Sequence, residues 1–130
     1  MAEQLDDETL AFAHRTFDLA RAGNSEELAS LLDGGLPPNL TNDKGETLLI
    51  LAAYHGHPDT VGMLLEHGAD TARVNDRGQT ALGAAVFRRS SDAVRALLAH
   101  GADPGLGSPS AIDVATFFEL ADMFALLQDG

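Results

Sequence analysis

The chain has 130 residues, a net charge of −12 and no cysteine. This length supports one hydrophobic core, and the lack of cysteine excludes disulfides, a thiolate nucleophile and a cysteine-ligated zinc site. The negative charge repels a polyanion at long range, so nucleic acid is not an expected partner. The longest apolar run, residues 48–54, is much shorter than a membrane span, and the acidic start does not have the pattern of a secretory signal. We therefore expect a single domain over residues 1–130 that is cytoplasmic and binds no membrane.

The first predicted helix extends unusually far towards the N-terminus. Leu10, Ala13, Phe17 and Ala20 follow one helical stripe, and no turn signal precedes them. We expect an extended helix here, which replaces a hairpin and caps the N-terminal end of the domain.

Two segments of the sequence occur twice, at a separation of 33 residues. NDKGETLL (residues 42–49) returns as NDRGQTAL (75–82), and LLEHGAD (64–70) returns as LLAHGAD (97–103). The first part of the chain matches the same spacing less faithfully. The sequence therefore contains an internal repeat with at least three copies, which predicts a stack of similar units.

Each unit is predicted to fold as turn, helix, loop, helix and turn. Asn, Asp and Gly mark the turn, and Thr47 or Thr80 stands where a hydroxyl can cap the first helix. In the second unit Gly56 ends this helix, and Pro58 opens the next one. That helix ends at Gly68, which can adopt the left-handed conformation of a C-terminal cap. Such short helix pairs cannot bury their apolar faces alone, so neighbouring units are expected to stack.

The last unit departs from the 33-residue period. SAIDVA (residues 110–115) aligns with TALGAA (80–85) at an offset of 30, which predicts a hairpin about one turn shorter. The following helix, residues 122–127, is expected to be shorter by one further residue, as in a truncated C-terminal cap. This segment is more apolar than a solvent-facing cap needs, so some of its side chains are expected to meet a partner surface, internal or external. The apolar residues are Leu120, Met123, Phe124, Leu126 and Leu127.

The 33-residue period, the G-x-T-x-L start of each first helix and the LLxxGAD end of each second helix resemble the ankyrin repeat. The resemblance implies an all-α solenoid of about four helix-turn-helix repeats with short β-turn or hairpin-like connections, whose first and last repeats act as caps. The implied repeats are residues 9–41 (approximate bounds), 42–74, 75–107 and a truncated 108–130. The family motif T-P-L-H appears as TLLI and TALG, without its histidine, so we expect softer turns.

In ankyrin-like stacks the hairpin tips and the exposed face of the first helices form a concave recognition surface. Transferred position by position, this family rule predicts a set of partner-binding residues. They are Arg21, Asp43, Lys44, Glu46, Tyr54, His55, Asp76, Arg77, Gln79, Phe87, Arg88 and Phe117. Ala22 and Phe118 fall at equivalent positions beside Arg21 and Phe117.

Four of these residues, Arg21, Tyr54, Phe87 and Phe117, fall at matching positions along the stack, and we call them the ridge. Arginine together with aromatic side chains is the composition of interface hot spots, which favours a partner-binding role. The alternative is that Phe87 and Phe117 turn inward and fill space between helices.

The sequence contains no recognisable catalytic motif. It has no glycine-rich phosphate loop with a following lysine, no G-x-S-x-G and no H-E-x-x-H. His55 and His57 offer two imidazoles, but they lie in a loop that often reads G-H in the family, where local hydrogen bonding is the ordinary role. We expect no enzyme activity, no cofactor and no metal.

The sequence therefore favours a protein-protein interaction module: an adaptor, inhibitor or immunity-type protein whose concave face binds one protein partner. The net charge of −12 favours a basic partner. The alternative is a structural or scaffold protein that self-associates through the apolar last repeat. We expect a monomer, with a dimer through residues near Phe124 as the alternative. The seven arginines to one lysine and the abundant alanine are typical of GC-rich bacterial coding sequences.

Overall fold

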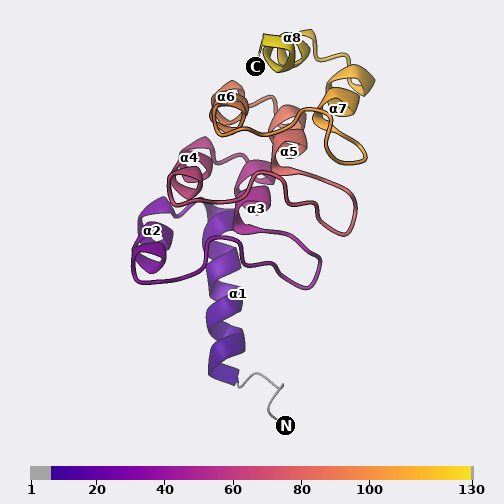
Figure 1. Ribbon diagram of the computed structural model, residues 1–130. Coiled ribbons are helices and arrows are strands. Elements are labelled where there is room, and N and C mark those ends of the chain that lie inside the picture. The colour runs from indigo at the N-terminus through magenta and orange to yellow at the C-terminus, as the bar shows by residue number, and fades with distance from the viewer. Residues whose placement is uncertain (1–6, 130) are drawn as a thin grey trace.

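The computed structural model describes residues 7–129, in which eight α-helices form four helix-turn-helix pairs (Figure 1). The pairs are α1 (Asp7–Ala22) with α2 (Ser25–Asp33), α3 (Leu48–Tyr54) with α4 (Pro58–Glu66), α5 (Ala81–Phe87) with α6 (Ser91–Ala99), and α7 (Ala111–Phe117) with α8 (Ala121–Asp129). The all-α solenoid that the repeats predict is confirmed.

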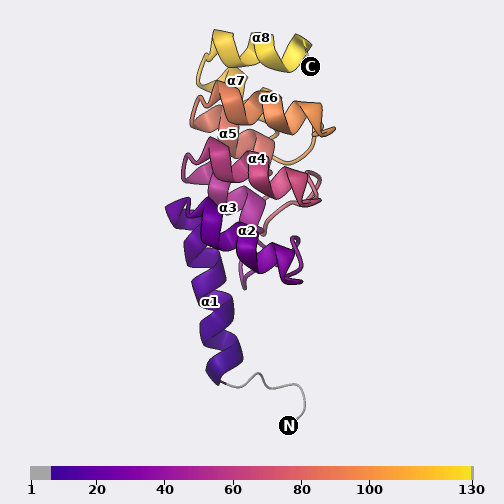
Figure 2. The same ribbon diagram turned by 90° about the vertical axis from the view of Figure 1, so that its left-hand side faces the viewer.

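The helices form two rows. α1, α3, α5 and α7 make an inner row in which each helix packs on the next, and α2, α4, α6 and α8 make an outer row in the same order. The hairpins before α3 and α5 project from the inner row, to the right in Figure 1, while Figure 2 shows the outer row from the front. Each pair thus packs on its neighbours along one axis, as in other repeat proteins.

The inner helices α3 and α5 are buried along almost their whole length. Thr47 and Thr80 each accept a hydrogen bond at the side-chain oxygen from a backbone N–H three residues later, so a hydroxyl caps each helix. The first six residues of each seven-residue helix are buried, and several are alanines that allow close approach. The last residue, Tyr54 in α3 and Phe87 in α5, reaches the surface.

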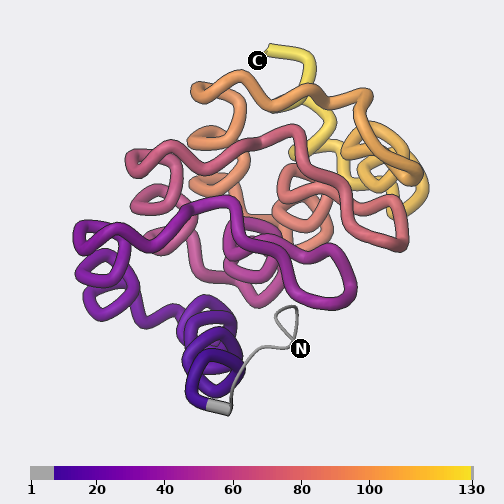
Figure 3. The backbone as a smooth tube through the Cα atoms, turned by 60° about the horizontal axis from the view of Figure 1, so that its bottom comes forward, coloured from indigo at the N-terminus to yellow at the C-terminus, as the bar shows by residue number. Residues whose placement is uncertain are grey.

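A single asparagine organises each hairpin. The Oδ1 of Asn42 accepts hydrogen bonds from the N–H groups of Lys44 and Glu46, and its Nδ2 donates to the Glu46 carboxylate. Asn75 makes the same three bonds in the next hairpin. The N–H of Asp76 donates to the carbonyl of Lys44 at 3.0 Å, so consecutive hairpins lie side by side (Figure 3). These bonds hold the hairpins of a chain without the family's histidine, and the softness of the turns stays a prediction.

Replacing Asn75 with alanine is expected to lower the free energy of unfolding by about 2 kcal/mol, because Asn75 is 5% exposed and its loss leaves two part-buried N–H groups without an acceptor. Urea denaturation measures this change. Asn42→Ala is the matched control, in which the same bonds come from a half-buried residue and a smaller loss is expected. A loss at Asn75 below about 0.5 kcal/mol is the range of ordinary surface substitutions and would mean that the hairpin does not depend on these bonds.

The last unit is shortened in its hairpin alone. Thr41 pairs with Thr47, six positions later, in an isolated β-bridge, whereas Gly107 pairs with Ser110, three positions later. α7 has seven residues and α8 has nine, the same lengths as α5 and α6. The expected shortening of the last helix is therefore wrong: α8 packs on α6 and has the same nine-residue length.

α1 is 16 residues long and runs past the end of the stack, as Figures 1 and 2 show in indigo. Its C-terminal half packs against α2 and α3, and Thr16, Phe17 and Ala20 are buried there. Its N-terminal half is open, with the side chains of Leu10 and Phe12 39% and 37% exposed. The predicted extended helix in place of a first hairpin is confirmed.

Candidate protein-binding surface

The ridge residues lie at the point where each inner helix leaves the core. Tyr54, Phe87 and Phe117 are the last residues of α3, α5 and α7, and they are 41%, 48% and 78% exposed. Arg21 lies in the last turn of α1, and its side chain is 38% exposed. The alternative, in which Phe87 and Phe117 fill space between helices, does not agree with these exposures. The structure thus places four large side chains in one exposed row along the stack.

Phe118, which the repeat alignment places on this surface beside Phe117, joins this row. Its ring meets Phe87 edge to face at a centroid distance of 5.5 Å and Phe117 at 4.9 Å. At the offset of 30 residues, Phe118 corresponds to Arg88, the residue that follows α5. That offset was the available sequence signal, but only the fold shows that the ring of Phe118 turns back towards α5. Three aromatic rings therefore form one cluster at the C-terminal end of the ridge.

A pocket of about 220 Å³ opens between the ridge and the hairpins. Its walls include the aromatic rings of Tyr54, Phe87 and Phe118. Gly83 also lines it, and as a glycine it contributes no side chain. Gly83 stands where the T-P-L-H motif has its histidine, so the departure from the family motif opens this space. The remaining lining residues come from the hairpins and from α7. They are Gln79, Thr80, Pro109 and Val114.

The predicted hairpin residues divide into two kinds. Asp43, Lys44, Asp76 and Arg77 are exposed at the tips, where a partner can reach them. Glu46 and Gln79 are half-buried and accept hydrogen bonds from the hairpin asparagines, so they hold the turns. The Glu46 carboxylate also lies 3.9 Å from the Arg77 guanidinium, which links the two hairpins.

A second groove, of about 800 Å³, lies between α1 and the first hairpin. Arg21, Asp43 and Lys44 line it together with the exposed flank of α1. The predicted residues therefore border two separate recesses, one at each end of the ridge, and the structure does not bring all twelve into one site.

Positive charge is concentrated beside the ridge. His55 follows α3 directly, and burial, together with the positive charges of Arg21, His57 and Arg88, lowers the pKa of its imidazole. The Arg88 guanidinium lies across Gly56, because a Cβ added there would be 2.7 Å from its Nη2. The chain as a whole is strongly acidic, so this row of bases is a local exception.

His57 has a structural partner. Its Nε2 lies 2.7 Å from the carbonyl oxygen of Arg21, which ties the loop of the second unit to the end of α1. Over residues 7–129, no group of three or more His, Cys, Asp or Glu side chains is placed to hold a metal ion. The same residues include no helix that is both long and apolar enough to span a membrane.

His67 connects the second unit to the first through a contact whose strength we expect to depend on pH. Its Nδ1 donates to the Met63 carbonyl and its Nε2 to the Asp33 carboxylate, both at 2.9 Å, and these bonds raise the pKa of the imidazole above its ordinary 6.5. Because the folded pKa is the higher one, the contact stabilises fully below the unfolded pKa and is lost as pH rises through the folded pKa. The melting temperature of His67→Gln is expected to fall further below wild type at pH 5.5 than at pH 8.5.

His100 supplies the matched control for this prediction. It occupies the equivalent position in the third unit and makes the backbone bond, to the Ala96 carbonyl, without a carboxylate within hydrogen-bond distance among residues 7–129. The difference between His100→Gln and wild type is expected to change less with pH. Identical pH profiles for the two variants would contradict the role of Asp33.

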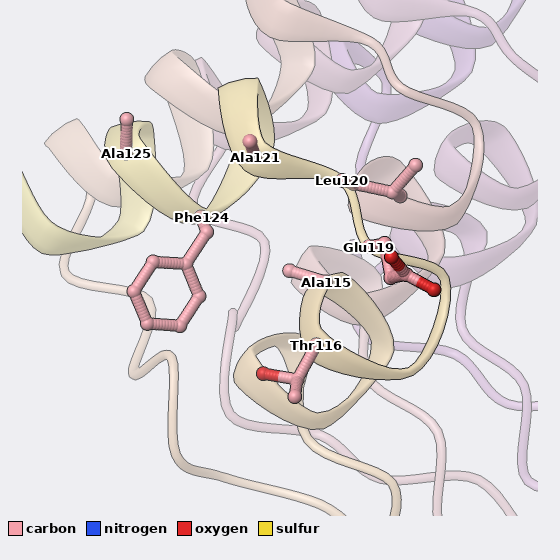
Figure 4. Close-up of a pocket in the computed structure, with 7 residues that line it drawn as sticks. All are labelled: Ala115, Thr116, Glu119, Leu120, Ala121, Phe124 and Ala125. Carbon is pink, nitrogen blue, oxygen red and sulfur yellow. The ribbon is translucent and has the colours of Figure 1, made fainter.

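The C-terminal end of the stack carries a further apolar surface. α7 and α8 form a shallow pocket of about 480 Å³ in which the ring of Phe124 faces the side of α7 (Figure 4). Met123 and Leu127 are buried and Leu120 and Leu126 pack partly against the core, so most of the apolar residues of this segment have an internal partner. Of these five apolar residues, Phe124 is the one whose large side chain stays at the surface, where it is 37% exposed.

Comparison with known proteins agrees with the geometry. A family model for ankyrin repeats (three copies) matches residues 17–107. The chain therefore belongs to the ankyrin-repeat family, whose members generally act as protein-protein interaction modules and are typically non-enzymatic.

A relative from Pseudomonas aeruginosa supports this assignment. It is an ankyrin repeat protein, and it is 64% identical to this chain over 58 residues, which make up 45% of this chain and 34% of the relative. The match thus spans about a third of the length of that relative, and it shows a bacterial homologue.

Proposed function

We propose that this protein binds one protein partner through its concave surface, as a non-enzymatic adaptor, inhibitor or immunity-type module. The observation that carries the proposal is the ridge: Tyr54, Phe87 and Phe117 are exposed at equivalent positions of three successive inner helices, beside a pocket. Aligned exposed aromatic side chains are costly to leave in water and are enriched at binding hot spots.

The rigidity of the stack supports the same proposal. Tyr54 and Phe87 sit at the ends of α3 and α5, whose other positions are all buried, so their backbone is already ordered before a partner arrives. Binding to such a surface loses little conformational entropy, which favours affinity.

Affinity capture from an extract of the native cell tests the proposal. The wild-type chain is expected to retain a protein that the Tyr54→Ala, Phe87→Ala double variant loses. The control is Phe12→Ala with Val74→Ala, which removes two side chains of comparable exposure, 37% and 42%, away from the ridge. All variants are first checked for unchanged thermal stability. Equal retention by the two double variants would place binding elsewhere on the molecule.

Self-association through the last repeat is the second candidate, and the exposed Phe124 beside the pocket of α7 and α8 favours it. This candidate predicts a molar mass that rises with concentration and returns to that of a monomer in Phe124→Glu. Sedimentation equilibrium measures both. A wild-type chain that stays monomeric over the whole concentration range would exclude it.

A further inference from the structure

The pocket beside the ridge selects for the size and polarity of what enters it. Its volume of about 220 Å³ is lined by the rings of Tyr54, Phe87 and Phe118 and by Gly83. Such an apolar recess has room for one large apolar side chain and not for a folded element. The natural occupant is an anchor residue of an extended segment, as at other interface hot spots.

The charge next to this pocket comes from Arg88. Arg88 follows Phe87, which lines the pocket, and its guanidinium lies beside Gly56, two residues after Tyr54, which also lines it. A Cβ at Gly56 would lie 2.7 Å from its Nη2, so the absence of a side chain there leaves room for the guanidinium. Among residues 7–129 it has no hydrogen-bond or ion-pair partner, although its neighbour Arg89 is paired with Asp122 at 3.1 Å.

Three carboxylates of this surface are already engaged. Asp18 accepts from Arg21 at 2.7 Å, Glu46 accepts from Asn42, and Asp113 accepts the N–H of Ser110 in a capping box. None of these three is free to neutralise Arg88. Next to the residues of the pocket, Arg88 therefore presents an unpaired cation with five N–H donors, which suits a carboxylate in a bidentate pair.

Resting on the proposed function, we propose that the concave surface recognises an extended peptide segment in which a large apolar side chain lies within three residues of an Asp or Glu. The apolar side chain fills the pocket, and the carboxylate pairs with Arg88. The net charge of −12 opposes an acidic partner only at long range, because exposed charges beyond about 8 Å are largely screened at physiological ionic strength. A partner that is neutral or basic overall and carries this short acidic motif satisfies both conditions.

Selection of a random 12-residue display library on the full immobilised chain tests this inference. Enriched peptides are expected to combine Phe, Trp, Leu or Met with a nearby Asp or Glu. Fluorescence anisotropy with the synthesised peptides is expected to show at least a tenfold loss of affinity for Arg88→Glu. Changing the peptide's acid to Lys is expected to restore binding to Arg88→Glu and to weaken binding to wild type.

Arg95→Glu is the matched control, because it reverses the same charge on the outer helix α6, where the side chain is 62% exposed. It is expected to change affinity less than twofold. Enriched peptides without an acid, equal effects of the two variants, or no enrichment would each overturn the inference.

These failures are distinct from failure of the proposed function. Peptides that lose affinity for the Tyr54→Ala, Phe87→Ala variant but not for Arg88→Glu overturn the carboxylate motif and leave the concave site standing. Without enrichment, the inference falls, and the capture experiment alone decides the proposed function, because a folded partner needs no linear motif.

Discussion

Replacing Leu64 with alanine is expected to lower the free energy of unfolding by about 3–4 kcal/mol, the range found when a leucine is removed from a packed core. Leu64 is 0% exposed in α4, a helix that packs against α2, α3 and α6. Its loss leaves a cavity between units that neighbouring helices cannot collapse into without disturbing their own contacts. Urea denaturation followed by circular dichroism measures the change.

Phe117→Ala is the control for this prediction. It removes a larger side chain than Leu64→Ala, but one that is 78% exposed and whose ring meets that of Phe118 edge to face. We expect it to cost less than about 1 kcal/mol, the scale of one aromatic pair. A loss as large as that of Leu64→Ala would place Phe117 in the core and remove it from the ridge.

Gly78→Ala is expected to cost about 3 kcal/mol or more, because two effects add. Gly78 has a φ of +80°, which L side chains rarely adopt, and a Cβ there would meet the carbonyl oxygen of Ser108 in the next hairpin. The Gly78 carbonyl also accepts the N–H of Ser108 at 2.8 Å, so the clash falls on one of the contacts between the last unit and the rest of the stack. Hydrogen exchange is expected to show loss of protection in α7 and α8 before the other helices.

Gly101→Ala separates the two effects. Gly101 has a φ of +88°, similar to that of Gly78, but no atom outside its immediate neighbours lies within 4 Å of an added Cβ. Gly101→Ala is expected to lower the free energy of unfolding only by the cost of the left-handed conformation, about 1–2 kcal/mol. Equal losses in the two variants would mean that the Ser108 contact contributes nothing.

The elements of this fold follow from local chemistry that recurs every 33 residues. Thr47 caps α3, Asn42 orders the hairpin before it, and Gly68 follows α4 with a positive φ, each through groups a few residues away. Because these interactions are local, residue type and spacing are enough to predict the helices, the turns and their repetition. Stacking follows in turn, since short amphipathic helix pairs have no other way to bury their apolar faces.

The binding surface was predictable only in part. The positions of Tyr54, Phe87 and Phe117 follow from the repeat, but whether their side chains face solvent or pack between helices depends on the neighbouring units, which spacing does not state. The sequence also predicted a last helix one residue too short, because an alignment of apolar residues contains no information on the packing of α8 along α6.

Several features depend on groups that are distant in the chain and adjacent only after folding. The ring of Phe118 meets Phe87, Arg88 lies across Gly56, and His67 reaches Asp33 in the preceding unit. The sequence determines the architecture because each unit is specified locally and repeated. The tertiary structure decides the pocket, the charge next to it and the contacts between units, because these depend on the exact distance and rotation between one repeat and the next.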